Sequence, residues 1–94
     1  MSDSTTESVR VWLVERTYSD DEQNLVILTY ATTDGKRYSR KERALTSFSD
    51  VRETTAAIDA DPGSVGPVED PELRERYAAE ATRMADEHDP DDAI

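Results

Sequence analysis

Two stretches of the chain, residues 9–18 and 25–32, are rich in β-branched and aromatic side chains, and each carries large apolar residues at odd and even positions alike. Side chains along a strand alternate between the two faces of its sheet. A sheet with one face in water therefore alternates apolar with polar residues, and these stretches do not. They predict two strands that must be covered on both faces, which constrains the fold more than any other feature of the sequence.

Turn residues predict how these strands connect. Residues 19–24 form a polar loop of the kind that joins two strands of a hairpin. The dipeptide Asp34-Gly35 suits a two-residue type I′ turn, because both residues tolerate a positive φ. A third strand is then expected over residues 36–45. The predicted unit is a three-stranded antiparallel meander.

Two helices are predicted after the meander. A short helix is expected between Ser47 and Asp61, with Ser47 or Ser49 as its N-cap. A longer helix begins at Asp70, a favourable N-cap, and has Pro71 in its first turn, where proline is tolerated. The longer helix carries an apolar stripe at helical spacing, which consists of Leu73, Tyr77, Ala81 and Met84.

The sequence thus predicts one α+β domain over residues 9–88, with a three-stranded antiparallel meander followed by two helices (β-β-β-α-α). A chain of 94 residues with few large apolar side chains supports no second core. Residues 1–8 are almost entirely polar and are predicted to form a disordered tail. Residues 89–94 are predicted to form an acidic tail.

The charge of the chain is strongly unbalanced. Asp and Glu number 22 against 11 Lys and Arg, which gives a formal net charge of −11. All the basic residues except Lys36 and Lys41 are arginine, and threonine is abundant. This composition resembles that of small acidic cytosolic proteins of halophilic archaea. The resemblance implies a cytoplasmic setting at high salt, where ions screen the repulsion between carboxylates. It implies no particular activity.

Several function classes are disfavoured by what the sequence lacks. With no cysteine, disulfides, iron–sulfur clusters and thiol catalysis are excluded, and a single histidine argues against structural zinc. The chain has no glycine-rich phosphate loop and no metalloprotease motif. No apolar run approaches the roughly 18 residues that span a membrane. We therefore expect a non-enzymatic protein that has no cofactor and does not enter a membrane.

Glu15 is the one acid centred in an apolar strand. Burial there would raise its pKa, unless the carboxylate pairs with a base such as Arg37 or Lys41 across the sheet.

Residues 36–43 hold five of the 11 basic residues of an otherwise acidic chain. They are the candidate anion-binding or partner-binding residues: Lys36, Arg37, Arg40, Lys41 and Arg43. One interpretation is an anion or nucleic-acid site, with tyrosines available for base stacking. The other is that this strand pairs with the protein's own carboxylates or with those of a partner subunit. High salt weakens phosphate contacts steeply, which favours the second interpretation.

Large apolar and aromatic residues of the strands form the candidate core or dimer face: Trp12, Val14, Tyr18, Tyr30 and Tyr38. One face of the sheet can take the long helix, and the other needs a cover of its own. An apolar face left in water would be adhesive, and two-fold dimers are the commonest oligomers. The sequence therefore predicts a homodimer that acts as a protein–protein interaction or regulatory module, with nucleic-acid binding through residues 36–43 as the alternative.

Overall fold

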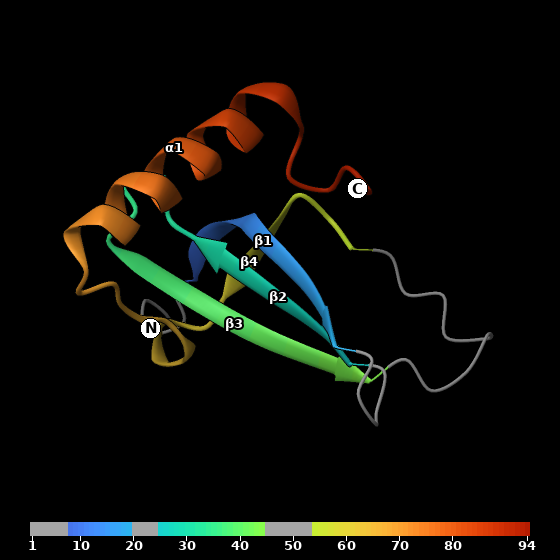
Figure 1. Cartoon of the computed structure of the whole chain (residues 1–94). Coiled ribbons are helices and arrows are strands. Elements are labelled where there is room, and N and C mark those ends of the chain that lie inside the picture. Colours follow the sequence, from blue (N-terminus) through green and yellow to red (C-terminus); the bar gives the residue numbers. More distant parts are fainter. Residues whose placement is uncertain (1–7, 20–24, 45–53) are drawn as a thin grey trace, which may run out of the picture.

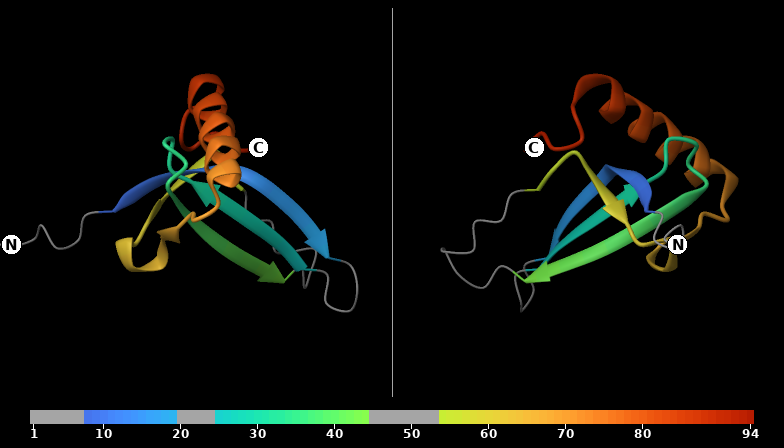
Figure 2. Two further views of the ribbon diagram at one scale, coloured as in Figure 1. Left: turned by 60° about the vertical axis from the view of Figure 1, so that its left-hand side comes forward. Right: turned by 180° about the vertical axis from the view of Figure 1, so that it is seen from behind.

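A computed structural model of the chain describes residues 8–19, 25–44 and 54–94. Its elements, in chain order, are β1 (Val9–Ser19), β2 (Leu25–Ala31), β3 (Arg37–Ala44), β4 (Ala57–Ala60), the short 3-10 helix η2 (Pro62–Ser64), β5 (Gly66–Pro67) and α1 (Pro71–Glu87). The strands in this part of the chain form one five-stranded antiparallel sheet in the order β4-β1-β2-β3-β5. The sheet is bent, and α1 lies across the outside of the bend (Figures 1 and 2).

The α+β class and the β1–β2–β3 meander are confirmed, but the arrangement of three strands and two helices is wrong. Residues 57–60, predicted as the end of a short helix, form β4 and pair with Val9–Trp12 of β1. The reason is tertiary: the strand partner satisfies backbone groups and buries Ala57 and Ala60, which outweighs a weak local helix preference. The predicted start of that helix, residues 47–53, lies outside the described residues.

The connection between β2 and β3 is longer than the predicted two-residue turn. Thr32 pairs with Arg37, to whose carbonyl it donates its N–H at 3.0 Å, so residues 33–36 form the loop. Gly35 has a φ of 73° and donates its N–H to the carbonyl of Thr32 at 2.8 Å. Asp34 holds the loop by accepting from the Thr32 hydroxyl at 2.6 Å and from the Lys36 N–H at 2.9 Å. These two hydrogen bonds lower the pKa of Asp34, with smaller contributions from the charges of Lys36 and Arg37.

A β-bulge at Val14 decides which side chains share a face. In the pairing of β1 with β2, Leu13 lies opposite Tyr30 but Glu15 lies opposite Thr29, so Val14 is an extra residue. Odd positions of β1 before the bulge therefore share a face with even positions after it. We call the side of the sheet that carries α1 the helix face and the opposite side the far face.

The far face is the more apolar of the two. Register places Val11, Leu13, Val26, Leu28 and Tyr30 on it, and these side chains are buried, with Val11 and Leu28 at 0% exposure and Tyr30 at 2%. The single chain thus covers these residues without a second copy. The helix face carries Trp12 and Ala31 near α1, where Ala31, Val68 and Tyr77 pack together.

The long helix is as predicted. The Asp70 carboxylate accepts from the N–H of Glu72 at 3.0 Å, Pro71 begins the helix, and Tyr77, Ala81 and Met84 are buried. The β2–β3 loop approaches α1 so closely that a Cβ atom at Gly35 would lie only 2.1 Å from the carbonyl oxygen of Arg74. No helix among the described residues is both long enough and apolar enough to cross a membrane.

The end of the chain lies beside β4. Ala56 donates its N–H to Asp92 at 2.8 Å, Ile94 donates to Thr54 at 2.9 Å, and the Arg16 guanidinium donates to the Ile94 carbonyl at 3.2 Å. The segment expected as an acidic tail is therefore attached to the sheet by its backbone. The domain limits at residues 9 and 88 stay predictions, and residues 1–7 of the predicted N-terminal tail lie outside the described residues.

Candidate functional site: a groove between the sheet and the helix

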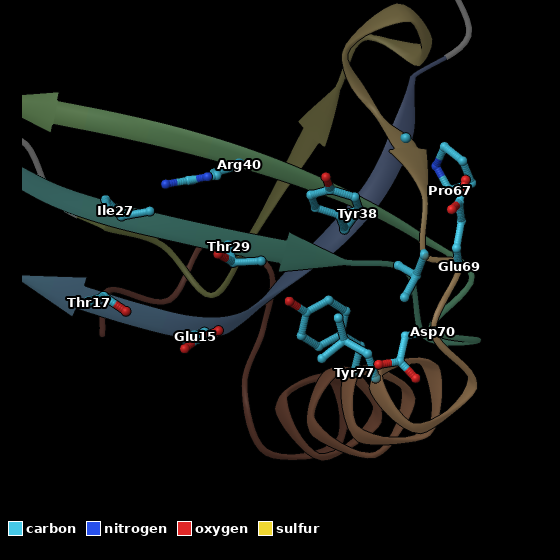
Figure 3. A pocket seen from close by; sticks show the side chains of 13 residues that line it. Glu15, Thr17, Ile27, Thr29, Tyr38, Arg40, Pro67, Glu69, Asp70 and Tyr77 are labelled. Carbon is cyan, nitrogen blue, oxygen red and sulfur yellow. The ribbon is translucent and has the colours of Figure 1, made fainter.

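An open groove of about 850 Å³ lies on the helix face, between the sheet and the N-terminal half of α1 (Figure 3). Its floor is formed by β1, β2 and β3, with Glu15, Thr29 and Arg40 among the lining residues. One wall is α1, and the other is β5 with the segment from Val68 to Asp70 that connects it to the helix. The groove is built on hydrogen-bonded strands and a capped helix, so its lining side chains are held by rigid elements.

Two tyrosine rings stand in this groove. Tyr77 of α1 is 8% exposed and Tyr38 of β3 is 36% exposed. Gly66 lies beside Tyr38: a Cβ atom there would be 3.8 Å from the Cε1 atom of the ring, an ordinary contact distance. Because Gly66 has no side chain, it leaves that part of the Tyr38 ring uncovered. Figure 3 shows the Tyr77 hydroxyl directed toward the side of the groove where Glu15 lies.

The electrostatics of the groove centre on Glu15. Burial raises the pKa of Tyr77, and the negative charge of Glu15 raises it further, against a smaller opposite effect from Arg76. The upward shift extends the neutral, hydrogen-donating form of the phenol to higher pH than the ordinary pKa of 10.0 would. Glu15 itself is exposed and makes no ion pair within the described part of the chain, so the expected pairing with Arg37 or Lys41 does not occur there.

Arg40 is the one basic residue among the groove-lining residues that the structure describes. Its guanidinium lies 3.5 Å from the Glu42 carboxylate, and both side chains are about half exposed, at 55% each. In Figure 3 the Arg40 side chain extends away from the two tyrosines. The end of the groove near α1 is instead bordered by Glu69 and Asp70. The groove therefore has a partly neutralised cation at one end and an acidic end beside the aromatic rings.

Strand geometry disperses the candidate basic residues. Arg40 lies on the helix face, whereas Arg37 and Lys41 occupy odd-numbered positions of β3 and share the far face. Lys36 lies in the β2–β3 loop, outside the strand. The strand register places Arg43 on the far face, and the structure does not describe its side chain. The structure therefore does not gather these residues into one basic surface.

The candidate core or dimer residues are also separated. Trp12 and Tyr30 are buried, and register places them on opposite faces of the sheet. Val14 is half-buried at the bulge and packs against the core. Tyr18 is 64% exposed and lies on the far face, and Tyr38 stands in the groove.

Among the residues that line the groove, only Tyr38 and Arg40 were predicted as site residues. Glu15 had a signal in the sequence, as an acid isolated in an apolar strand, but Tyr77 reads as one more member of a core stripe and Gly66 as a turn residue. Their proximity depends on the path of residues 66–70, which local pattern does not reveal. Among the described residues, no group of three or more His, Asp or Glu side chains is arranged to hold a metal ion.

The chain belongs to a family of unknown function, DUF7967, whose sequence pattern it matches over residues 5–94. No curated protein is significantly similar to it, and neither is any solved structure. Family membership does not indicate the type of organism, so the halophilic source stays a prediction.

Proposed function

For this member of a family of unknown function, we propose a non-enzymatic interaction module that binds a segment of a partner protein in the groove between the sheet and α1. The observation that carries the proposal is the open groove itself, in which Tyr38 is left exposed on a rigid floor. Exposed aromatic rings with polar neighbours are typical of protein-binding surfaces, where tyrosine supplies contact area at a low entropic cost.

The chemistry of the lining favours binding over catalysis. The titratable groups around the tyrosines are carboxylates and phenols, while His88 caps the opposite end of α1. General acid–base work near neutral pH is most often done by a group whose pKa is tuned toward that range. The pKa of Tyr77 is instead shifted upward, away from neutral pH.

An extended partner segment has a backbone site next to the groove. β5 pairs with β3 only at Arg37 and Tyr38, so the outer edge of β3 beyond Tyr38 has no neighbouring strand within the described ranges. The backbone N–H and C=O groups of successive residues in a strand point to opposite sides. Those of Ser39 and Lys41 pair with β2, so those of Arg40 and Glu42 point toward the outer edge. A strand added there would direct every second side chain toward the helix face and the groove.

Self-association is a second candidate, because the same edge is complementary to itself. If two copies paired antiparallel about a two-fold axis at Lys41, Arg40 would lie opposite Glu42 of the second copy on both sides of the axis. The two lysines would face each other, which is a cost. Covering a bare sheet face is no longer a reason for such a dimer, since a single chain already buries Val11, Leu28 and Tyr30.

Anion or nucleic-acid binding receives less support from the geometry. Such a site needs cationic groups that converge, and here Arg40 and Lys41 lie on opposite faces of the sheet. Loss of single-stranded nucleic acid binding in Lys41→Glu, together with a steep salt dependence in the native protein, would favour this alternative.

A peptide-display selection tests the groove. Random peptides are selected on the native protein and counter-selected on Thr17→Trp, in which a large strand-compatible side chain occupies an exposed groove position. We expect enriched peptides to bind the native protein and to shift the amide resonances of β1, β3 and α1 at the groove. Enriched peptides that bind both proteins equally, or a failure to enrich any, would contradict the proposal.

Sedimentation equilibrium tests the dimer. We expect Glu42→Arg to weaken self-association, because the substituted side chain would repel Arg40 of the second copy instead of attracting it. A native protein that stays monomeric at millimolar concentration would exclude this candidate. We place the module in the cytoplasm of a high-salt organism on the strength of its composition alone.

A further inference from the structure

We propose that the groove recognises a guanidinium group, an arginine side chain of the partner segment, that stacks on the ring of Tyr38 beside Tyr77 with Glu15 as its counter-ion. This inference rests on the proposed function and specifies the chemistry of the residue that enters the groove. Three features of the site support it: the negative charge of its carboxylates, its tyrosine rings and the hydroxyl of Tyr77.

The charge around the tyrosines fits a cation. Glu15 is exposed and has no ion-pair partner within the described ranges, and Glu69 and Asp70 line the same groove. Asp70 already accepts the Glu72 N–H, and Glu15 is the carboxylate whose charge acts on Tyr77, so Glu15 is the one beside the rings. Arg40 does not compete for Glu15, because it lies 3.5 Å from Glu42 and is directed along the groove away from the rings (Figure 3).

The rings fit a flat cation. A guanidinium is attracted to the face of a tyrosine ring and can stack on it, since the ring carries partial negative charge above its plane. Tyr38 is accessible because Gly66 has no side chain to cover it. Tyr77 is buried and contributes a fixed part of the groove wall rather than an open ring face.

Arginine fits this site better than lysine. A guanidinium matches a carboxylate with two parallel hydrogen bonds and sheds its water more readily than an ammonium group does. The Tyr77 hydroxyl is directed toward the side of the groove where Glu15 lies, which places a hydrogen-bond donor close to that carboxylate (Figure 3). Stacking also persists when salt screens exposed charges, so the site does not depend on charge alone.

Titrations with N-acetyl-argininamide, followed by amide and tyrosine-ring resonances, test the inference. N-acetyl-citrullinamide, which is neutral and nearly the same shape, and N-acetyl-lysinamide are the comparison ligands. We expect saturable shifts at Glu15, Tyr38 and Tyr77 for the arginine compound, weaker ones for the lysine compound and none for the citrulline compound. Glu15→Gln should weaken binding by about 1.4- to fivefold, the range for an exposed charge pair.

Glu75→Gln is the matched control. Glu75 is an exposed carboxylate of α1 that does not line the groove, so its replacement changes the net charge equally while leaving the site intact. Gly66→Val gives a second measurement, because its side chain would contact the Tyr38 ring and should reduce binding without disturbing the fold. Equal binding by native protein and Glu15→Gln, or equal binding of the arginine and citrulline compounds, would overturn the inference.

The peptide selection separates this inference from the proposed function. Groove-binding peptides that share an arginine and lose affinity for Glu15→Gln support both. Groove-binding peptides without a common arginine would overturn the guanidinium site and leave the interaction module standing. If no enriched peptide binds the groove, the interaction module fails, and the inference fails with it.

Discussion

Replacing Gly35 with alanine should destabilise the fold more than any other single methyl group added to the described glycines. Gly35 has a φ of 73°, in the region that is costly for residues with a Cβ atom, by about 1–2 kcal/mol. The added carbon would also lie 2.1 Å from the Arg74 carbonyl oxygen and 2.9 Å from the Ala78 nitrogen. Both are backbone atoms of α1, so no side chain can rotate out of the way.

The two costs add, because one is the strain of the Gly35 backbone at positive φ and the other is the steric clash of the added carbon with α1. Forcing an extra carbon into a packed site costs about 1–3 kcal/mol. We therefore expect Gly35→Ala to lower the free energy of unfolding by roughly 2–5 kcal/mol, the sum of the two ranges. That is a large part of the about 5–15 kcal/mol by which small domains are stable.

Urea unfolding followed by the fluorescence of Trp12, the single tryptophan, gives this free energy. Gly63→Ala is the control, because a Cβ atom there meets nothing within 4 Å. It should be neutral or stabilising, by up to ~1 kcal/mol. Gly35→Asn separates the two costs, since asparagine tolerates a positive φ but keeps the clash with α1. A loss below about 1 kcal/mol for Gly35→Ala would refute the close approach of the loop to the helix.

Four further predictions concern titration and salt. Glu15→Gln should lower the pKa of Tyr77 toward its ordinary value of 10.0 without restoring it, because burial remains the larger cause; phenolate absorbance against pH measures this. Since the folded-state pKa of Tyr77 is raised, its stabilising contribution is present below pH 10.0 and is lost as pH rises through the folded pKa, which alkaline unfolding would show. The pKa of Asp34 is lowered, so its contribution is present above the ordinary value of 3.8 and is lost as pH falls through the folded pKa. Asp34→Ala should therefore cost on the order of 0.5 kcal/mol at neutral pH and nothing in strong acid, and an equal cost at both would contradict the loop contacts. The thermal midpoint should rise from low to molar KCl because the net charge is −11, and a flat or falling midpoint would remove the high-salt interpretation.

The meander and α1 could be predicted because their signals are local. Asp70 and Pro71 mark a helix start by their own chemistry, and the stripe of Tyr77, Ala81 and Met84 repeats at the helical period. β4 could not be predicted, because Ala57 and Ala60 have no β preference of their own. They become a strand only when β1 supplies a partner.

The faces of the sheet could not be predicted for a different reason. Alternation assigns faces only while the pairing register is unbroken, and the extra residue Val14 breaks it. Nothing in the local sequence marks Val14 as a bulge, since valine is at home in a regular strand. The bulge explains two features at once: β1 is apolar on odd and even positions, and Glu15 comes to lie on the helix face beside Tyr77.

The proposed guanidinium site offers a source of selectivity that the net charge of the chain does not. A net charge of −11 attracts basic segments to the whole surface at low salt, and this attraction alone cannot distinguish one segment from another. At about 1 M salt the screening length is near 3 Å, so only charges in contact still act. Selectivity under those conditions must come from groups within contact distance of the ligand, and in the proposed site these are Glu15 and the ring of Tyr38, beside Tyr77. The salt dependence of binding should therefore have a steep part, shared with Glu15→Gln, that reflects net charge, and a residual affinity at molar salt that is weaker in Glu15→Gln than in the native protein.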